Sequence, residues 1–120
     1  MYELSIEQTF RATHAITIAG QVEQTHEHDW VVKVVVQGDK LDEEGLLVDF
    51  HQLEAQLKMV TEPFIGNDFG DVEPFITSNP TAELIAQHIA EQISLNLPSG
   101  IKIKCVSVTE APNCVATYRP

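Results

Sequence analysis

Two runs of alternating residues, 4–14 and 26–36, constrain the fold of this chain more than any other feature. The first run places apolar residues and one histidine on a single parity: Leu4, Ile6, Phe10, Ala12 and His14. The second run places two histidines and an apolar series on a single parity: His26, His28, Trp30, Val32, Val34 and Val36. Because side chains alternate between the two faces of a strand, the pattern predicts two half-buried strands with all three histidines on the core side.

If these strands pair as an antiparallel hairpin, His14 lies beside His26 and His28. Three imidazoles are the ligand set of a catalytic zinc site that leaves its fourth position open. Independent surface histidines are the alternative interpretation, but they would not need the core-side parity. A buried imidazole also needs a partner, which a shared metal ion supplies. The sequence therefore predicts Zn²⁺ bound by these three histidines.

Composition limits the class of protein. With 120 residues the chain has room for one domain, so we predict a single domain over residues 1–120. A net charge of −11 argues against nucleic acid and anionic membranes as partners, because phosphate binding depends on Lys and Arg. No segment approaches a membrane span, and the first five residues lack the pattern of a signal peptide. We therefore expect a cytoplasmic protein.

The remaining elements follow from local signals. Residues 15–25 contain Gly20 and predict a long, mobile connection between the two strands. Asp49 is expected to cap a first helix, with Gln52 placed for a capping box, and that helix stops by Pro63. Residues 61–79 are rich in Gly and Pro and predict an irregular connection, anchored by three aromatic residues: Phe64, Phe69 and Phe75.

A second helix is predicted to start at Asn79-Pro80, with Asn79 as the N-cap and Pro80 at the first helical position. Its expected apolar stripe consists of Leu84, Ile85, Ile89 and Ile93. A strand over 101–108 changes parity midway, which predicts a bulge, and a closing strand follows the turn at 111–113. The predicted fold is a two-layer α+β domain in the order ββααββ, a four-stranded antiparallel sheet with two helices on one face.

The two cysteines, Cys105 and Cys114, flank the last predicted turn. They could face each other across the final hairpin, but a cytosolic chain keeps such thiols reduced. We expect free, partly buried thiols.

The order of elements and several motifs are similar to those of the 6-pyruvoyl-tetrahydropterin synthase family, which includes the 6-carboxy-tetrahydropterin synthases of queuosine biosynthesis. The motifs are Phe10-Arg11-Ala12-Thr13-His14, His26-Glu27-His28, Gly45-Leu46-Leu47-Val48-Asp49-Phe50, Asn79-Pro80-Thr81-Ala82-Glu83 and Thr109-Glu110. The resemblance implies the tunnelling fold, in which sheets of several subunits join into a barrel, commonly a homohexamer built from two trimers.

For individual residues, the resemblance implies that His14, His26 and His28 bind zinc and that Glu110 holds a pterin. A carboxylate suits that role because the 2-amino-4-oxopyrimidine edge offers two adjacent N–H donors. The alternative is that Glu110 only starts the turn beside Pro112. Thr81 is carried over as a second substrate-binding residue, with a purely structural role at the helix start as its alternative.

The sequence also departs from the family pattern. The position of the usual catalytic cysteine, four residues before the His-x-His pair, is Val22, and the usual Asp-His pair falls on Glu62 and Pro63. Cys105 and Cys114 lie in the last two strands and do not replace the missing thiolate. Glu23 lies three residues before His26. This pattern resembles that of a subgroup of the family, linked to making a pterin precursor for folate, in which a glutamate takes the place of the cysteine. The alternative is that Glu23 is a solvated loop acid.

The first hypothesis is a zinc-dependent pterin enzyme, a carbon–oxygen lyase acting on 7,8-dihydroneopterin triphosphate or a related pterin, with Glu23 as the catalytic proton-transfer group. The alternative is a non-catalytic paralogue that binds zinc and a pterin. A metal-sensing or storage domain, with zinc but no pterin affinity, is a third possibility. His51 and His88 are expected to be surface or packing residues of the helices.

Overall fold

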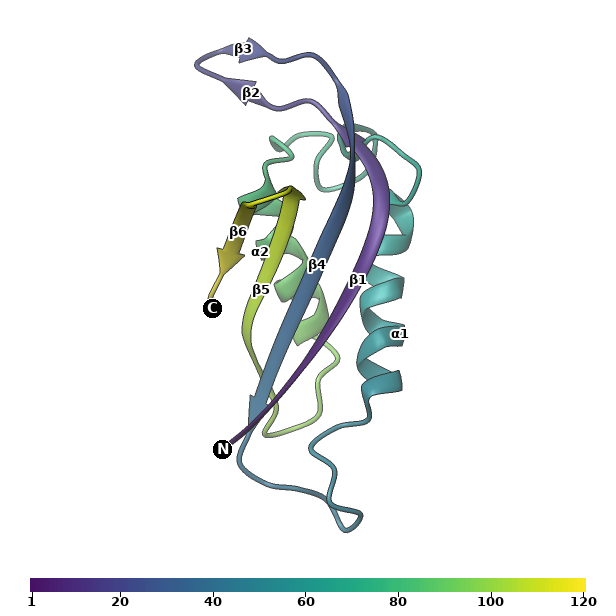
Figure 1. The fold of residues 1–120 in the computed structure, drawn as a ribbon, viewed down its shortest axis with the longest axis vertical. Coiled ribbons are helices and arrows are strands. Elements are labelled where there is room, and N and C mark those ends of the chain that lie inside the picture. The colour runs from purple at the N-terminus through teal and green to yellow at the C-terminus, as the bar shows by residue number, and fades with distance from the viewer.

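The two histidine-bearing runs form the longest strands of the sheet and pair along their whole length. In the computed structural model, which describes residues 1–120, β1 (Tyr2–His14) lies antiparallel to β4 (His26–Gly38). Phe10 is opposite Trp30 and His14 is opposite His26. β5 (Lys102–Ala111) pairs with the other edge of β4, and β6 (Cys114–Tyr118) completes the sheet in the order β1-β4-β5-β6 (Figure 1).

Two helices, α1 (Phe50–Thr61) and α2 (Ala82–Ser94), cover one face of this sheet (Figure 1). The predicted ββααββ order and the two-layer α+β architecture are confirmed. Between the helices lie two short 3-10 helices, η1 (Glu62–Phe64) and η2 (Phe69–Asp71). Neither α1 nor α2 has the length and apolarity that crossing a bilayer demands.

The buried face of the sheet follows the predicted parity. On β1 and β4 the buried apolar residues are Ile6, Phe10, Ala12, Trp30, Val32, Val34 and Val36. Burying a large apolar side chain contributes about 1.5–3 kcal/mol, so this face supplies much of the drive for docking the helices. It also fixes the register, since a slip by one residue would turn the whole apolar set toward solvent.

The irregular connection between the helices is anchored as expected, because Phe64, Phe69 and Phe75 are all buried. The ring of Phe64 stacks on that of Phe69 at a centroid distance of 4.6 Å, and Phe69 packs edge-on against Trp30 at 5.3 Å. The backbone N–H of Thr13 also donates to the carbonyl of Asn67 at 3.0 Å. The connection is therefore fixed against the strand end that carries the histidines.

The start of the second helix was predicted wrongly. Thr81, not Asn79, is the N-cap of α2, and its hydroxyl oxygen accepts a hydrogen bond from the backbone N–H of Leu84 at 3.1 Å. Asn79 and Pro80 stay outside the helix because both have tertiary partners. The side chain of Asn79 binds the backbone of Thr17, and the carbonyl of Pro80 binds His14.

Leu84 was also wrongly assigned to the buried stripe of α2, since it is 40% exposed. Ala86 and Ala90 are buried instead, together with Ile85, Ile89 and Ile93. Small residues on this face let the helix axis approach the sheet closely. The predicted capping box of α1 does not form either, because Asp49 caps the helix by accepting from the N–H of His51, while the side chain of Gln52 makes no hydrogen bond.

The connection over residues 15–25 contains a short hairpin, β2 (Thr17–Ile18) and β3 (Gln21–Val22), which projects beyond the end of the sheet (Figure 1). Its two turn residues, Ala19 and Gly20, have φ values of 50° and 79°. A two-residue turn with positive φ at both positions matches the twist of the flanking strands. The predicted long connection is thus a hairpin of its own.

β5 contains two irregularities in its pairing. Val35 and Val36 pair with Cys105 and Ile103, which leaves Lys104 as the extra residue and confirms the predicted bulge. A second irregularity lies between Thr109 and Ala111 and leaves Glu110 unmatched. Both cysteines are free, as predicted, but Cys114 is exposed rather than partly buried.

We predict that Thr81→Ala lowers the free energy of unfolding by about 1 kcal/mol, because it removes the N-cap of α2. Thr81→Ser keeps the hydroxyl and should restore most of the loss. Chemical denaturation of the three proteins measures the effect, with Ser78→Ala, an exposed neighbour without a side-chain hydrogen bond, as the control. An unchanged stability for Thr81→Ala would contradict the assigned cap.

Candidate metal and substrate site

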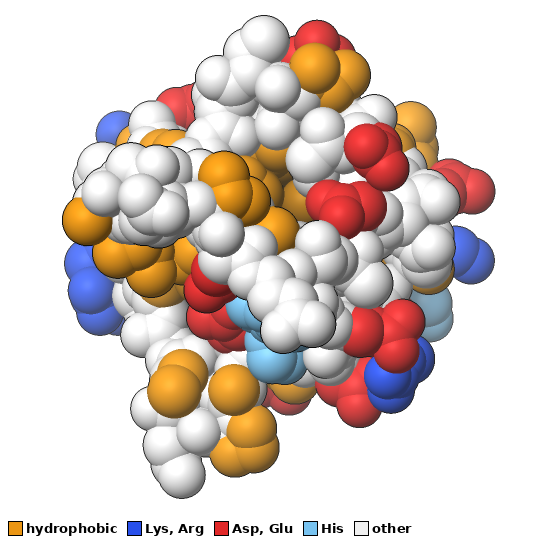
Figure 2. Space-filling model, turned by 90° about the horizontal axis from the view of Figure 1, so that it is seen from above, with side chains coloured by type: hydrophobic (Ala, Val, Ile, Leu, Met, Phe, Trp, Pro, Cys, Tyr) orange, Lys and Arg blue, Asp and Glu red, His pale blue; other side chains and the backbone are white.

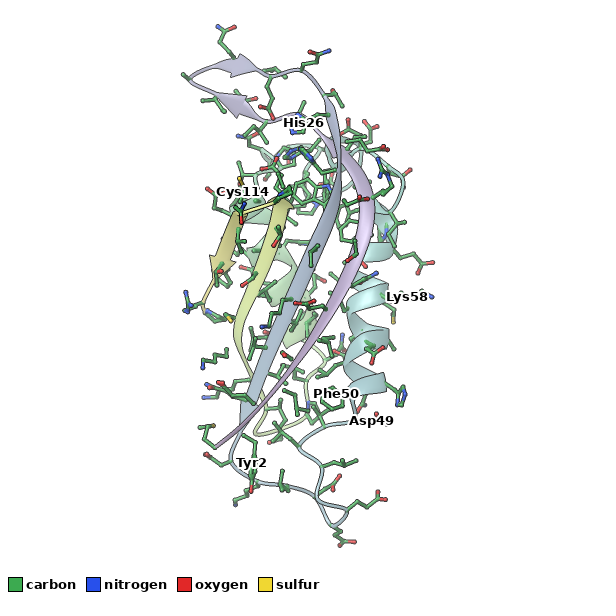
Figure 3. The ribbon with its side chains drawn as sticks, in the orientation of Figure 1. Tyr2, His26, Asp49, Phe50, Lys58 and Cys114 are labelled. Atoms are coloured by element: carbon green, nitrogen blue, oxygen red, sulfur yellow. The ribbon has the colours of Figure 1, made fainter.

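The β1–β4 register gathers the three predicted histidines at one end of the sheet. His14 is the last residue of β1, and His26 and His28 open β4. The ring of His26 lies 4.5 Å from each of the other two rings, centroid to centroid. The side chain of His14 is fully buried, and those of His26 and His28 are partly exposed. Figure 3 shows His26 at this end, directly below the projecting hairpin.

Backbone carbonyls fix the orientation of two of these rings. Nδ1 of His14 lies 2.9 Å from the carbonyl oxygen of Pro80, and Nδ1 of His26 lies 3.0 Å from that of Gln24. A carbonyl oxygen only accepts, so each Nδ1 carries the proton. In the neutral form of each ring, Nε2 therefore presents a lone pair toward the centre of the cluster.

The arrangement of the Nε2 atoms fits a bound cation. Nε2 of His14 and Nε2 of His26 are 2.7 Å apart, and two lone pairs at this distance repel unless a proton or a metal ion lies between them. Ligand atoms of His14, His26, His28 and Glu110 all lie within 4.8 Å of one another. Neutral imidazoles with Nδ1–H bound to carbonyls are the donors that zinc prefers in three-histidine sites. The group can hold a metal ion, and its chemistry suits zinc.

Glu110 reaches the histidine cluster from the bulge in β5. Its Oε1 contacts Nε2 of His14 and lies 3.4 Å from Nε2 of His26 and 3.7 Å from Nε2 of His28. Bulges redirect a side chain, and here the unmatched residue turns its carboxylate into the site. Seen from the hairpin end, histidine surface shows between acidic side chains (Figure 2).

An open cavity of about 380 Å³ lies beside Glu110. It is lined by Ala82 and Glu83 at the start of α2 and by four residues of β6: Cys114, Val115, Ala116 and Thr117. Thr81 is adjacent in sequence but does not line the cavity, and its hydroxyl oxygen is engaged in capping α2. Because the Thr81 hydroxyl acts only as an acceptor in this cap, its proton is still available for donation. Glu110 thus stands between the histidine cluster and a cavity large enough for a small bicyclic ligand.

Glu23 is the other carboxylate at the site. Its Oε1 lies 3.7 Å from Nε2 of His26 and accepts a hydrogen bond from the backbone N–H of Ile16 at 3.1 Å. The backbone N–H of Glu23 donates to the carbonyl of Ile16 at 2.9 Å. Its neighbour Val22 is 72% exposed on the hairpin. The structure therefore brings Glu23 to the histidines, whereas no cysteine lies there.

The surroundings shift the pKa of two site histidines in opposite directions. For His26, burial disfavours the charged ring, but the Gln24 carbonyl and the carboxylates of Glu110 and Glu23 outweigh it and raise the pKa above 6.5. For His28, burial and then the charge of His26 lower the pKa below 6.5. A cluster that holds neighbouring rings at different pKa values reduces repulsion between positive charges.

The remaining histidines lie away from the site, as predicted. His51 is exposed on α1 and pairs with Asp49. His88 is half-buried on α2, edge-on to Phe64 and Phe75, and burial lowers its pKa. Sequence reasoning missed the roles of the Pro80 and Gln24 carbonyls and of the Asn79 side chain. Backbone carbonyls carry no residue-type signal, and Asn79-Pro80 resembles an ordinary helix start.

We predict that His26→Ala leaves the protein with far less than one equivalent of zinc, because two imidazoles form a poor site. Metal content after zinc loading and dialysis, measured by plasma mass spectrometry, checks this. His51→Ala, which changes an exposed histidine elsewhere, should retain zinc at the level of the unaltered protein. Near-stoichiometric zinc in His26→Ala would refute the three-histidine site.

Comparisons with known proteins place the chain in one family. The family model described as 6-pyruvoyl tetrahydropterin synthase matches residues 3–120. The 6-carboxy-5,6,7,8-tetrahydropterin synthase of Bacillus subtilis is 31% identical over 99% of this chain and 86% of its own length. The dihydroneopterin monophosphate aldolase of Pyrococcus furiosus is 33% identical over 85% of this chain and 83% of its own length.

Solved structures show the same fold. The 6-pyruvoyl tetrahydropterin synthase of Caenorhabditis elegans superposes with a TM-score of 0.82 at 22% identity, covering 100% of this chain and 97% of the other. A Plasmodium vivax 6-pyruvoyltetrahydropterin synthase, a glutamate-to-alanine catalytic residue mutant, superposes with a TM-score of 0.75 at 19% identity, covering 99% and 97%. The family match over nearly the whole chain establishes that this protein belongs to the 6-pyruvoyl tetrahydropterin synthase family of pterin enzymes.

Proposed function

We propose that this protein is a zinc-dependent lyase that acts on the side chain of 7,8-dihydroneopterin triphosphate or a closely related 7,8-dihydropterin. The observation that carries the proposal is the meeting of three imidazole Nε2 atoms with two carboxylates, Glu110 and Glu23, at one end of the sheet. His14, His26 and His28 would hold the zinc. Zinc bound there would lower the pKa of a side-chain hydroxyl and polarise a carbonyl.

Glu110 would hold the pterin ring. Its carboxylate can accept two parallel hydrogen bonds from the 2-amino-4-oxopyrimidine edge. The cavity beside it, of about 380 Å³, has a suitable size for the bicyclic ring, and the side chain of the substrate would then extend toward the histidines. Thr81, one residue before the cavity lining, would donate its free hydroxyl proton to the same ligand.

Glu23 would move protons on the substrate side chain. Its Oε1 lies 3.7 Å from Nε2 of His26. A positioned general base contributes typically ~10²–10⁴-fold in rate. The Plasmodium vivax synthase, in which a glutamate is described as a catalytic residue, supports a carboxylate in this role. Val22 and Pro63, at the positions of the missing family groups, offer no proton-transfer group.

Two lyase reactions are compatible with this site. Carbon–oxygen elimination would release triphosphate, as expected for a synthase of this family. Carbon–carbon cleavage would shorten the side chain, as the name of the Pyrococcus furiosus aldolase implies for that protein. A single carboxylate is sufficient for the second reaction, because the proton it removes from a hydroxyl can return to the carbon left behind. The length of the side chain in the pterin product shows which of the two reactions takes place.

A non-catalytic pterin-binding protein is the second candidate, favoured by the loss of the cysteine and the Asp-His pair. It requires the zinc ligands and Glu110 but not Glu23. A metal-sensing or storage protein would require only the histidines. The three functions therefore differ in which carboxylate matters.

We predict that the zinc-loaded protein converts 7,8-dihydroneopterin triphosphate or monophosphate, and that Glu23→Gln lowers kcat by ~10²–10⁴-fold with zinc content unchanged. Product chromatography of each substrate measures turnover. Glu54→Gln, an exposed glutamate on α1, is the matched control and should leave kcat unchanged. Equal turnover by Glu23→Gln would exclude Glu23 as the base, and absence of turnover with either substrate would favour the non-catalytic candidate.

We predict that Glu110→Gln weakens pterin binding about ten- to hundredfold, because the amide loses the charge-assisted acceptor pair. Isothermal titration of the zinc-loaded protein with 7,8-dihydroneopterin measures the Kd. Unaltered affinity would contradict the anchoring role, and no pterin affinity in the parent protein would support a metal-sensing or storage protein.

We also propose that copies of the chain join edge to edge into a barrel, as a homohexamer. β1 and β6 are the edges of the sheet, and an exposed edge offers unpaired backbone groups to another strand. We predict a sedimentation mass several times the 13.3 kDa of one chain. A mass equal to that of the single chain would contradict the barrel.

A further inference from the structure

The hairpin β2–β3 has little of its own to hold it in place. All of residues 17–22 are exposed, so the hairpin buries almost no apolar surface. Its strands contribute only two paired positions, Thr17 with Val22 and Ile18 with Gln21. A two-stranded hairpin of this size is not stable by itself in water. Something outside the hairpin must therefore fix its direction.

The side chain of Asn79 ties the hairpin to the rest of the protein through two hydrogen bonds to Thr17. Its Oδ1 accepts a hydrogen bond from the backbone N–H of Thr17 at 2.8 Å, and its Nδ2 donates to the carbonyl of Thr17 at 2.9 Å. The amide thus satisfies both backbone groups of one residue, as a neighbouring strand would. No other hydrogen bond joins residues 17–22 to a part of the chain outside this connection.

Asn79 is itself held by rigid structure. Its carbonyl accepts from the N–H of Thr81, which caps α2, and α2 is packed against the core. The next residue, Pro80, is buried, and its carbonyl fixes His14. The position of the Asn79 amide is therefore set by the same segment that sets a metal ligand.

The tie leads directly to Glu23. Thr17 follows Ile16, and Ile16 binds Glu23 twice: its N–H donates to Oε1 at 3.1 Å, and its carbonyl accepts from the N–H of Glu23 at 2.9 Å. A change in the path of the chain at Thr17 would displace Ile16 and with it the carboxylate beside His26. We propose that Asn79 is a positioning residue that holds Glu23 over the metal site.

This inference rests on the proposed role of Glu23 in catalysis, but the tie itself can be tested without any turnover. In Asn79→Ala, the amide protons of Thr17 and Glu23 should exchange with solvent about tenfold faster, as expected when hydrogen bonds of ordinary strength are lost. Asn79→Asp keeps the acceptor and loses the donor, so it should restore part of the protection of Thr17. Hydrogen exchange followed by nuclear magnetic resonance gives both values, with Ser78→Ala as the matched control.

The effect on catalysis is tested by a double-mutant cycle between Asn79 and Glu23. Asn79→Ala should lower kcat about ten- to hundredfold, with the KM for the dihydropterin and the zinc content unchanged, because a misplaced general base costs rate rather than binding. In the Glu23→Gln background the same substitution should have no further effect, since Asn79 acts through Glu23. A merely structural residue would lower the activity of both backgrounds equally.

The outcomes separate the two claims. Unchanged exchange at Thr17 and Glu23 in Asn79→Ala would overturn the tie, whatever the protein catalyses. Faster exchange in a protein without turnover would support the tie and refute the proposed function. Faster exchange combined with an equal loss of kcat in both backgrounds would overturn the positioning of Glu23.

Discussion

The candidate site depends on the register between β1 and β4. Because His14 lies opposite His26 where the connection over residues 15–25 joins the two strands, strand pairing alone brings three imidazoles together. The same register places Phe10 opposite Trp30, and Trp30 packs edge-on against His14 at 4.7 Å. The apolar core and the histidine cluster therefore fix the register together, and a slip of one residue would disrupt both.

The segment Asn79-Pro80-Thr81 links this strand pair to the helices. Each residue uses a different group: the Asn79 side chain binds the hairpin, the Pro80 carbonyl orients His14, and the Thr81 hydroxyl caps α2. On the β5 side of the site, a bulge turns the carboxylate of Glu110 toward the histidines. These two parts of the chain, distant in sequence, thus position His14, Glu23 and Glu110.

Much of the fold and the clustering of the three histidines could be predicted from the sequence, because period-two alternation is a local property and all three histidines share one parity. The N-cap of α2 could not be predicted from the sequence. Asn79 and Pro80 carry the ordinary signals of a helix start, but their partners lie 62 and 66 residues away and hold them outside the helix. Leu84 was misplaced because helical spacing alone does not show which of two adjacent apolar residues meets the sheet. That Glu23 and Glu110 reach the histidines depends on a hairpin and a bulge, which residue spacing does not reveal.

The central claim is that one cation occupies the centre of the histidine cluster. Anomalous diffraction at the zinc edge from crystals of the zinc-loaded protein tests it most directly. We expect a single strong peak ~2.0–2.1 Å from Nε2 of each of His14, His26 and His28. A peak elsewhere, or one that lacks any of these three nitrogen atoms as a ligand, would contradict the account.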